Sequence, residues 1–311
     1  RRNILTRRKT MHTKKSKGYI VFNVLNILFM ILLGIVMIFP YLNTLAKAFN
    51  DAADSARGGL TIFPRIFTLE NFKTVLKDDA IPTATLVSVS RVLISVVLSI
   101  VVQFGAAYAL SIKTFPGKKI FVWMYTLPMF ISAGMVPLYV LITKIGLLNN
   151  FWVYIIPTLF SFYNVVIIRT FIQSTIPDSL QESAKVDGAN EVTIFFRIIL
   201  PLSKPILATI ALWVMVGQWN DWTTTLYYIR KPSLYTLQYI MMQMVKESER
   251  IQQMIQAAIA AGESAEMVRN VPSSESLTAA QVIVTTIPII CVYPFLQKYF
   301  VKGIMIGSVK G

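Results

Sequence analysis

The sequence has few residues of the kinds that carry catalysis, metal binding or redox chemistry. Its 311 residues include one cysteine, Cys291, and one histidine, His12. A single cysteine cannot form a disulfide within its own chain. The sequence has no cluster of His, Cys, Asp and Glu with metal-ligand spacing, and no nucleophile beside a base. We therefore predict neither a metal site nor an enzyme active site.

Charge is scarce as well. Charged residues make up 14% of the sequence and hydrophobic residues 55%, and the mean hydropathy is +0.59. This composition would leave a soluble protein of this length with too little polar surface, so we predict an integral membrane protein. The net charge of +15 does not indicate nucleic-acid binding, because no basic surface interleaved with aromatic residues accompanies it.

Six segments are apolar over roughly the 20 residues that a membrane-spanning helix needs. The second contains one charged residue, Arg91, and the other five contain none. The fifth is short, but a helix that starts at Pro201 would be long enough. We predict an all-α integral membrane fold with six transmembrane helices, at residues 19–40, 82–112, 120–143, 146–168, 205–220 and 277–297.

The distribution of charge predicts which side of the membrane each end occupies. An even number of spans returns the chain to its starting side, so both termini share a compartment. That side carries 18 of the 30 Lys and Arg residues and only 4 of the 15 Asp and Glu residues. Basic residues concentrate in the cytoplasmic loops of membrane proteins, so both termini are predicted to be cytoplasmic.

Two long loops are predicted on the outer side, at about residues 41–81 and 221–278. In the first, Thr68 precedes Leu69-Glu70, which predicts a helix capped by Thr68. In the second, residues 241–266 are rich in good helix formers, and Val271-Pro272 then break the helix. Two interpretations of the second loop stay open: a solvated lid without a partner, or a surface that contacts an extracellular protein, which we favour.

The cytoplasmic segment 173–203 is a polar island between apolar spans. Asp178 or Ser179 is expected to cap a short helix, with Glu182 near its first turn, where negative charge is favourable. Small residues leave one face of this helix shallow, so that another protein can approach closely. A short helix held between two spans moves with them, which suits the transmission of force from a cytoplasmic motor.

This segment carries a motif. The order Glu-Ser-Ala, three residues, Gly, nine residues, Ile-x-Leu-Pro resembles the EAA loop, E-A-A-x3-G-x9-I-x-L-P, of permease subunits in binding-protein-dependent ABC importers. The one departure is Ser183 in place of alanine. The matching residues are Glu182, Ser183, Ala184, Gly188, Ile198, Leu200 and Pro201.

The resemblance extends over most of the chain. Asp187-Gly188-Ala189, Trp219-Asn220-Asp221 and the C-terminal Phe300-Val301-Lys302-Gly303 are similar to the carbohydrate-uptake branch, the second permease of MalG type. The stretch from Tyr293 to Phe300 is closer still to the LplC/YtcP-type permeases of oligosaccharide and polysaccharide uptake. The resemblance implies the type I ABC importer permease fold, termed MetI-like, at residues 19–303, between a basic cytoplasmic tail at 1–18 and a C-terminal cytoplasmic tail at 304–311.

The family implies partners and a cellular location. Two permeases form the path, here a heterodimer with a second homologous subunit in a bacterial cytoplasmic membrane. Two ATPase subunits hold ATP and Mg²⁺, and an extracellular solute-binding protein delivers the sugar. This chain has no G-x-x-x-x-G-K-[ST] phosphate-binding motif, so no cofactor is expected on it.

The resemblance also implies residue roles. The coupling helix, at about residues 178–190, contacts the ATPase, and the C-terminal Lys310 and Gly311 reach the same interface. The coupling residues are Glu182, Ser183, Ala184, Asp187, Gly188 and Ala189.

Polar side chains inside the spans are candidates for a sugar path, since polar groups in hydrocarbon usually face a bundle interior or a water-filled cavity. For Arg91, Gln103 and Asn164 the alternative is an interhelical hydrogen bond. For Trp219 it is anchoring at the membrane interface. The residues assigned to the path are Tyr163, Asn164, Trp219 and Asn220.

Two other classes of protein were weighed. A secondary transporter that works without an ATPase would need a coupling-ion site, typically acidic residues within the spans, and the predicted spans contain none. A membrane-embedded enzyme or assembly factor would need catalytic groups at the end of a span, where Asp221 alone is present. The permease interpretation is therefore preferred.

Overall fold

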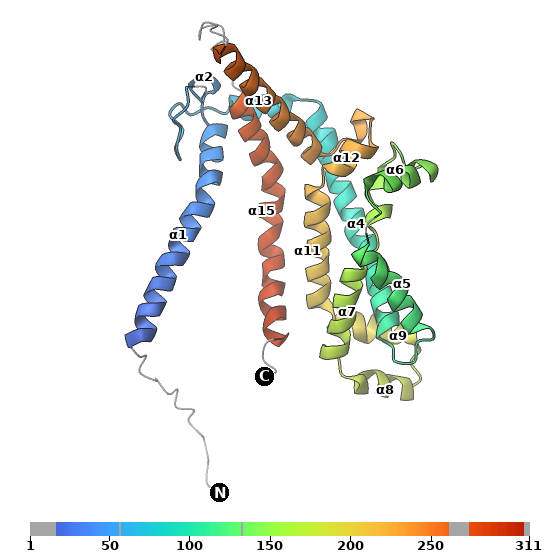
Figure 1. The fold of residues 1–311 in the computed structure, drawn as a ribbon. Coiled ribbons are helices and arrows are strands. Elements are labelled where there is room, and N and C mark those ends of the chain that lie inside the picture. Colours follow the sequence, from blue (N-terminus) through green and yellow to red (C-terminus); the bar gives the residue numbers. More distant parts are fainter. Residues whose placement is uncertain (1–16, 56, 132, 261–273, 308–311) are drawn as a thin grey trace.

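The computed structural model describes residues 17–55, 57–131, 133–260 and 274–307, and these residues form helices joined by turns and loops (Figure 1). Within the described ranges no β-strand forms, and the extended pairing present is an isolated antiparallel bridge between Asn50 and Phe67. The prediction of an all-α fold is confirmed for this part of the chain.

Several helices run along the length of the molecule in Figure 1. α4 packs against α7 and α11, and α15 packs against both α11 and α1. Buried small residues on α4, among them Ser88, Ser95 and Ser99, let neighbouring helices approach it closely. The bounds of these helices are α1 Lys17–Ala48, α4 Ala80–Ser111, α7 Phe162–Thr175, α11 Lys204–Asn220 and α15 Ser274–Gly307.

Two described helices, α1 and α4, are each long and apolar enough to cross a membrane. Two bent helix pairs, 151–158 with 162–175 and 191–202 with 204–220, bring the number to four if each pair is one span. Shorter apolar helices lie at Met135–Lys144 and Glu275–Cys291. A helical protein with several apolar spans is thus supported, while the number six and the side of each terminus stay predictions.

The predicted third span, residues 120–143, is not one helix. α5 (Lys118–Phe130) ends two residues after Pro128, and α6 (Met135–Lys144) begins after Gly134. Gly134, the residue before α6, has a φ of +84°, a conformation that glycine adopts readily and that lies outside a helix. Proline cannot donate a backbone hydrogen bond, so Pro128 weakens the end of α5. Such a break does not change the mean hydropathy of the segment, so the length of the apolar run predicted a continuous helix.

The fourth and fifth predicted spans are bent. The fourth begins as two 3₁₀ turns, η1 (Phe151–Tyr154) and η2 (Ile156–Thr158), and α7 continues it after a bend of 49°. In the fifth, α10 (Leu200–Leu202) precedes a bend of 78° and α11 begins at Lys204. The predicted extension of the fifth helix back to Pro201 is therefore wrong, because Pro205 in the first turn of α11 cannot continue the hydrogen bonding of the preceding turn.

Shorter elements gather at the two ends of the long helices (Figure 1). One end, named here the α13 end, carries α2 (Ala52–Ser55), α6, α12 (Thr223–Tyr228) and α13 (Leu237–Ala260). The opposite end, the α8 end, carries α8 (Asp178–Val186) and α9 (Glu191–Ile194), followed by the π-helical turn η3 (Phe195–Ile199). Lys310, Gly311 and residues 1–16 of the basic tail lie outside the described residues.

The two loops predicted to lie on the outer side hold helices close to where the sequence predicts them. The N-cap residue of α3 (Glu70–Lys77) is Leu69 and not the predicted Thr68, although the Thr68 hydroxyl accepts the backbone N–H of Glu70 at 3.1 Å. The η4 turn (Pro232–Leu234) leads into α13, which begins four residues before the predicted position. The predicted break at Val271-Pro272 lies outside the described residues.

Candidate functional site

The helix that carries the motif lies across the end of the bundle. α8 connects α7 to α9 and in Figure 1 runs nearly at right angles to the long helices. Pro177 is its N-cap residue, and no side chain caps the helix. The predicted cap by Asp178 or Ser179 is thus wrong, because the chain enters the helix one residue earlier. The Asp178 carboxylate instead accepts a hydrogen bond from Lys113 Nζ at 2.6 Å.

The other end of α8 is closed by the glycine of the motif. Gly188 has a φ of +81°, which L side chains rarely adopt. Its N–H donates to the Lys185 carbonyl at 3.0 Å, and the Ala189 N–H donates to the Ala184 carbonyl at 2.9 Å. These two bonds satisfy the last carbonyls of the helix in the Schellman arrangement. Gly188 therefore makes the turn that ends α8.

The coupling residues divide between two faces. Ala184 and Ala189 are half-buried and pack against the hydrophobic cluster at the α8 end. Glu182, Ser183 and Asp187 are exposed, as is Gly188. The small alanines thus let α8 approach its own bundle, and the polar residues lie on the free face. Val186, which the sequence reasoning missed, is exposed as well, with 88% of its surface accessible to solvent.

A polar cluster ties α8 to α4. Lys185 Nζ lies 2.7 Å from Glu191 Oε1, and the buried Tyr108 hydroxyl donates to Glu191 Oε2 at 2.6 Å. We name Tyr108, Lys185 and Glu191 the α8 clamp. Sequence reasoning missed it, because Tyr108 lies 83 residues from Glu191 and Lys185 meets Glu191 only through the turn at Gly188.

Apolar packing supports the same connection. Phe195 of η3 lies against the rings of Phe104 and Tyr108 on α4, with centroid distances of 5.3 and 5.2 Å. Ile176 and Ile194, at the two ends of the segment that holds α8, are buried in the same cluster. The segment that holds α8 is therefore packed against α4 and is joined along the chain to α7 and α9.

The residues assigned to a sugar path do not form one surface. Tyr163 is exposed and stacks on Trp213 of α11 at a centroid distance of 6.2 Å. Asn164 is buried and donates to Gln103 Oε1 at 3.0 Å, and Gln103 donates to the Leu159 carbonyl at 2.9 Å. Asn220 is exposed. Their assignment to the path stays a prediction, with Tyr163 and Asn220 the members that a solute can reach.

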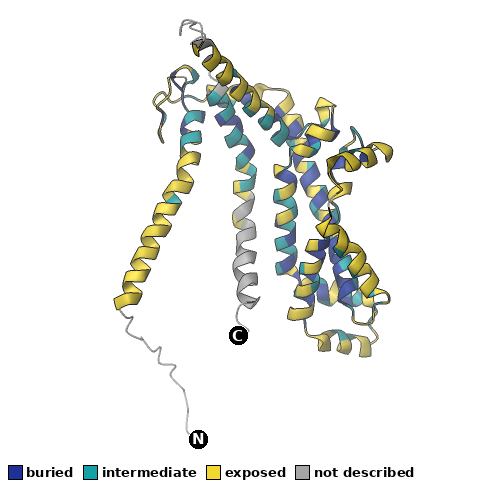
Figure 2. Ribbon diagram, in the orientation of Figure 1, coloured by how far each residue is buried: buried dark blue, intermediate teal, exposed yellow. Residues whose placement is uncertain are grey.

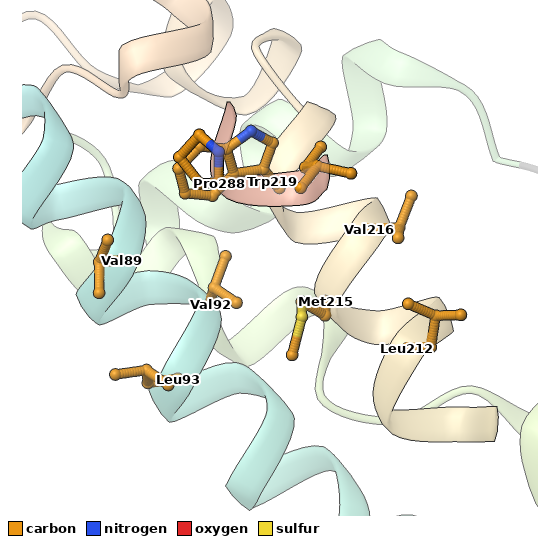
Figure 3. A pocket seen from close by; sticks show the side chains of 9 residues that line it. Val89, Val92, Leu93, Leu212, Met215, Val216, Trp219 and Pro288 are labelled. Atoms are coloured by element: carbon orange, nitrogen blue, oxygen red, sulfur yellow. The ribbon is translucent and has the colours of Figure 1, made fainter. Parts of the chain in front are cut away.

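Trp219 lines a hollow of about 180 Å³ between α4, α11 and α15 (Figure 3). The indole N–H donates to the Thr285 carbonyl of α15 at 3.2 Å, so its polar atom is already used. Side chains without hydrogen-bonding groups make up the rest of the wall, which does not suit the hydroxyls of a sugar. The lining residues are Val89, Val92, Leu93, Leu212, Met215, Val216, Trp219, Pro288 and Ile289.

Arg91 forms a buried junction toward the α13 end. Its side chain is 1% exposed and pairs with the Asp221 carboxylate. Arg91 Nε donates to Gln218 Oε1 at 2.7 Å, and the guanidinium lies 4.5 Å from the centroid of the Tyr154 ring. Of the two interpretations given for Arg91, the geometry matches the interhelical anchor, which joins α4, η1 and the end of α11.

Comparisons with known proteins agree with the motif. Residues 104–306 match the family described as "Binding-protein-dependent transport system inner membrane component". The chain is 36% identical over 302 residues to "Protein LplC" of Bacillus subtilis, covering 97% of this chain and 98% of that protein. It is 33% identical to the "Polygalacturonan/rhamnogalacturonan transport system permease protein YtcP" of the same organism, covering 91% and 96%.

A solved structure has the same fold. It is described as a bacterial ABC transporter involved in the import of the acidic polysaccharide alginate. The TM-score is 0.81 at 25% sequence identity, and the alignment covers 92% of this chain and 98% of the other. The helical architecture described above is therefore shared with a component of an ABC importer.

Proposed function

The chain belongs to the family of inner membrane components of binding-protein-dependent transport systems, and from this premise we propose that it is one of two permease subunits of an ATP-driven carbohydrate importer. The observation that carries the proposal is the geometry of α8. α8 is a short helix with an exposed polar face, is tied to α4 by the α8 clamp and is continuous with α7 and α9. A movement of a cytoplasmic partner bound to that face would therefore move the bundle.

The coupling surface would be the exposed face of α8. We assign Glu182, Ser183, Asp187 and Gly188 to contact with an ATPase subunit, and Ala184 and Ala189 to holding the helix on the bundle. The exposed Val186 adds apolar area to the contact. ATP and Mg²⁺ would bind to the two partner ATPase subunits. The C-terminal Lys310 and Gly311 are proposed to reach the same interface.

Carbohydrate is the substrate class that the relatives' names support, with an oligosaccharide or polysaccharide as the form. In the proposed path the exposed Tyr163 and Asn220 contact the solute, while the buried Asn164 and Trp219 hold their helices against α4 and α15. The Tyr163 ring and its neighbour Trp213 offer aromatic surfaces on which sugar rings stack.

In the proposed membrane placement the α8 end faces the cytoplasm and the α13 end faces outward, in a bacterial cytoplasmic membrane. Six spans lie within residues 19–303, between the basic tail at 1–18 and the C-terminal tail at 304–311. The outer loops at 41–81 and 221–278 would meet a solute-binding protein. A second, homologous permease would complete the path as a heterodimer.

The proposed cycle follows from these connections. Closure of the ATPase pair moves α8, and α4, α7 and α11 move with it, so that the path opens alternately to each side of the membrane. A secondary transporter is not supported, because the family works with a binding protein and the apolar spans predicted from the sequence lack acidic residues.

The test is gentle affinity purification of the chain from its native membrane, with identification of the proteins that co-purify. We expect a second permease and an ATPase that carries the phosphate-binding motif absent here. Recovery of a homo-oligomer alone would overturn the proposal. Sugar-stimulated ATP hydrolysis by the recovered complex then identifies the substrate.

A further inference from the structure

The loop between α2 and α3 is ordered by a polar network on one side. The buried Asn50 Oδ1 accepts the backbone N–H groups of Arg65 and Ile66, each at 2.8 Å. Arg65 Nε donates to the Asp54 carboxylate at 2.8 Å, and Asp51 N–H donates to the Ile66 carbonyl at 2.9 Å. These bonds fix the backbone, so the side chains of residues 60–69, named here the apolar loop, are displayed in set positions.

The apolar loop displays large hydrophobic side chains. Phe63 is 74% exposed and Phe67 is 66% exposed, and Ile62, Ile66 and Leu69 are exposed as well. Phe67 stacks on Phe49 with one face, at a centroid distance of 5.5 Å, so its other surface is free of that contact. Exposed apolar side chains at this density on a fixed loop mark a surface that is covered in the assembled protein.

The loop lies beside the outer part of α1. Asn43 of α1 donates to the Leu60 and Thr61 carbonyls, both at 2.8 Å. Ile62 then lines a hollow of about 350 Å³ together with Ile35, Ile38 and other residues of α1. In Figure 1 the chain between α2 and α3 turns down beside the upper end of α1.

Contact with α1 sets the depth of the loop. Lys47 of α1 pairs with Glu275 of α15 at 2.8 Å and marks the polar end of the helix. Leu42, which lines the hollow with Ile62, is five residues below Lys47, or about 7.5 Å at 1.5 Å per residue. That depth falls in the range in which interfacial segments bury their apolar side chains.

We propose that the apolar loop inserts Ile62, Phe63, Ile66 and Phe67 into the lipid leaflet at the α13 end, as an interfacial anchor beside α1. Lipid is the occupant because the loop continues the exposed apolar surface of α1, whose large side chains from Tyr19 to Phe39 are exposed (Figure 2). The inference rests on the membrane placement proposed above for α1.

Spin-label accessibility tests this insertion in the assembled complex, reconstituted in phosphatidylethanolamine and phosphatidylglycerol vesicles. In a Cys291→Ser background, a nitroxide at Phe63→Cys or Phe67→Cys is expected to collide severalfold more with oxygen, relative to a water-soluble nickel chelate, than one at the exposed Arg57→Cys. Two loop positions are used so that one poorly folding variant does not decide the result, and each complex is first checked for transport.

The other outcomes overturn the proposal. Nickel collisions at residues 63 and 67 as frequent as at residue 57 place the loop in water. Low collision rates with both reagents place it against another protein, either the second permease or the binding protein. A label at Val36→Cys, on the exposed surface of α1, separates the insertion of the apolar loop from the membrane placement of α1. If residue 36 is in lipid while residues 63 and 67 are in water, only the insertion fails. If residue 36 itself is in water, the membrane placement of α1 fails as well.

Discussion

At the scale of single residues, Glu191 decides how firmly α8 is held. One carboxylate oxygen accepts from Tyr108 and the other pairs with Lys185. The two contacts differ in solvation, because Tyr108 is buried whereas Lys185 and Glu191 are each about half exposed. A hydrogen bond to a charged group contributes about 1.5–3 kcal/mol, and an exposed ion pair about 0.2–1 kcal/mol. The contact with Tyr108 therefore holds Glu191, and with it the start of α9, on α4 more strongly than the pair with Lys185 holds α8 to α9.

We expect Tyr108→Phe to uncouple the complex more than Lys185→Met does. In reconstituted vesicles, Tyr108→Phe should lower transport per ATP hydrolysed, while Lys185→Met has a small effect and Glu191→Gln resembles Tyr108→Phe. Lys113→Met is the matched control, because its pair with Asp178 is exposed on both sides. An equal loss of coupling in the Lys185 and Tyr108 variants would contradict this ranking.

Arg91 supports the fold rather than the coupling. Its removal leaves the partly buried Asp221 carboxylate without its charge partner, a change that typically costs about 3–5 kcal/mol when a buried pair is broken. We expect Arg91→Met to lower the free energy of unfolding in detergent by an amount in the lower part of that range, because Asp221 retains some contact with solvent. The midpoint of thermal inactivation measures the change.

The control for Arg91 is the double variant Arg91→Met with Asp221→Asn. Because the second change removes the unpaired charge, the double variant should be more stable than Arg91→Met alone. A double variant that loses the sum of the two single losses would show that the charges are not coupled.

The residue scale also shows where sequence reasoning is limited. An arginine in an apolar span must find a partner, so the anchoring interpretation of Arg91 follows from the sequence. Nothing in the sequence places Glu191 beside Tyr108, because the two residues are 83 positions apart and meet only when the start of α9 packs against α4. Residues whose role depends on distant packing therefore appear only in the structure.

At the scale of elements, substitutions of Gly188 at the end of α8 test the proposed contact between α8 and an ATPase subunit. A residue other than glycine in the left-handed conformation costs about 1–2 kcal/mol, and asparagine tolerates it better than alanine. A Cβ atom at Gly188 would have no neighbour within 4 Å in this chain. Gly188→Ala therefore tests backbone strain, and Gly188→Arg tests strain together with the bulk that a partner would meet.

We expect Gly188→Asn to retain most of the transport activity, Gly188→Ala to reduce it, and Gly188→Arg to abolish coupling while the protein still inserts into the membrane. Transport by vesicles and the amount of protein in the membrane fraction measure the two effects. Equal activity of the Ala and Arg variants would contradict an ATPase surface close to Gly188, and loss of the Arg variant from the membrane would indicate a folding role.

The spans show what hydropathy can and cannot predict. It located both ends of α4 and the start of α1 within two residues, because both helices are apolar over more than the required length, but α1 continues eight residues past the predicted end at Pro40. It missed the break between α5 and α6 and the bends before α7 and α11, because proline and glycine change the path of the chain without changing its mean hydropathy. The bend before α7 adjoins Tyr163 and Asn164, and the bend before α11 adjoins the end of the motif.

At the scale of the whole molecule, the open question is whether the broken segment α5–α6 crosses the membrane. α5 lies toward the α8 end and α6 at the α13 end in Figure 1. The Asn149 N–H, just after α6, donates to the Tyr228 carbonyl of α12 at 2.8 Å, which ties this segment to the α13 end. The fold thus connects the two ends of the molecule through 118–144, although no single helix does so.

We expect single cysteines at Lys119 and Lys144 to lie on opposite sides of the membrane. In a Cys291→Ser background and sealed vesicles, an impermeant maleimide should reach Lys144→Cys from the side that labels Gln252→Cys of α13, and Lys119→Cys from the side that labels Ser179→Cys of α8. All four positions are exposed in this chain. If Lys119 and Lys144 instead share a side, the segment is re-entrant and the number of spans falls to five. The two termini would then face opposite compartments, which the charge distribution disfavours because the basic N-terminal tail and the C-terminal lysines both belong to the positively charged side.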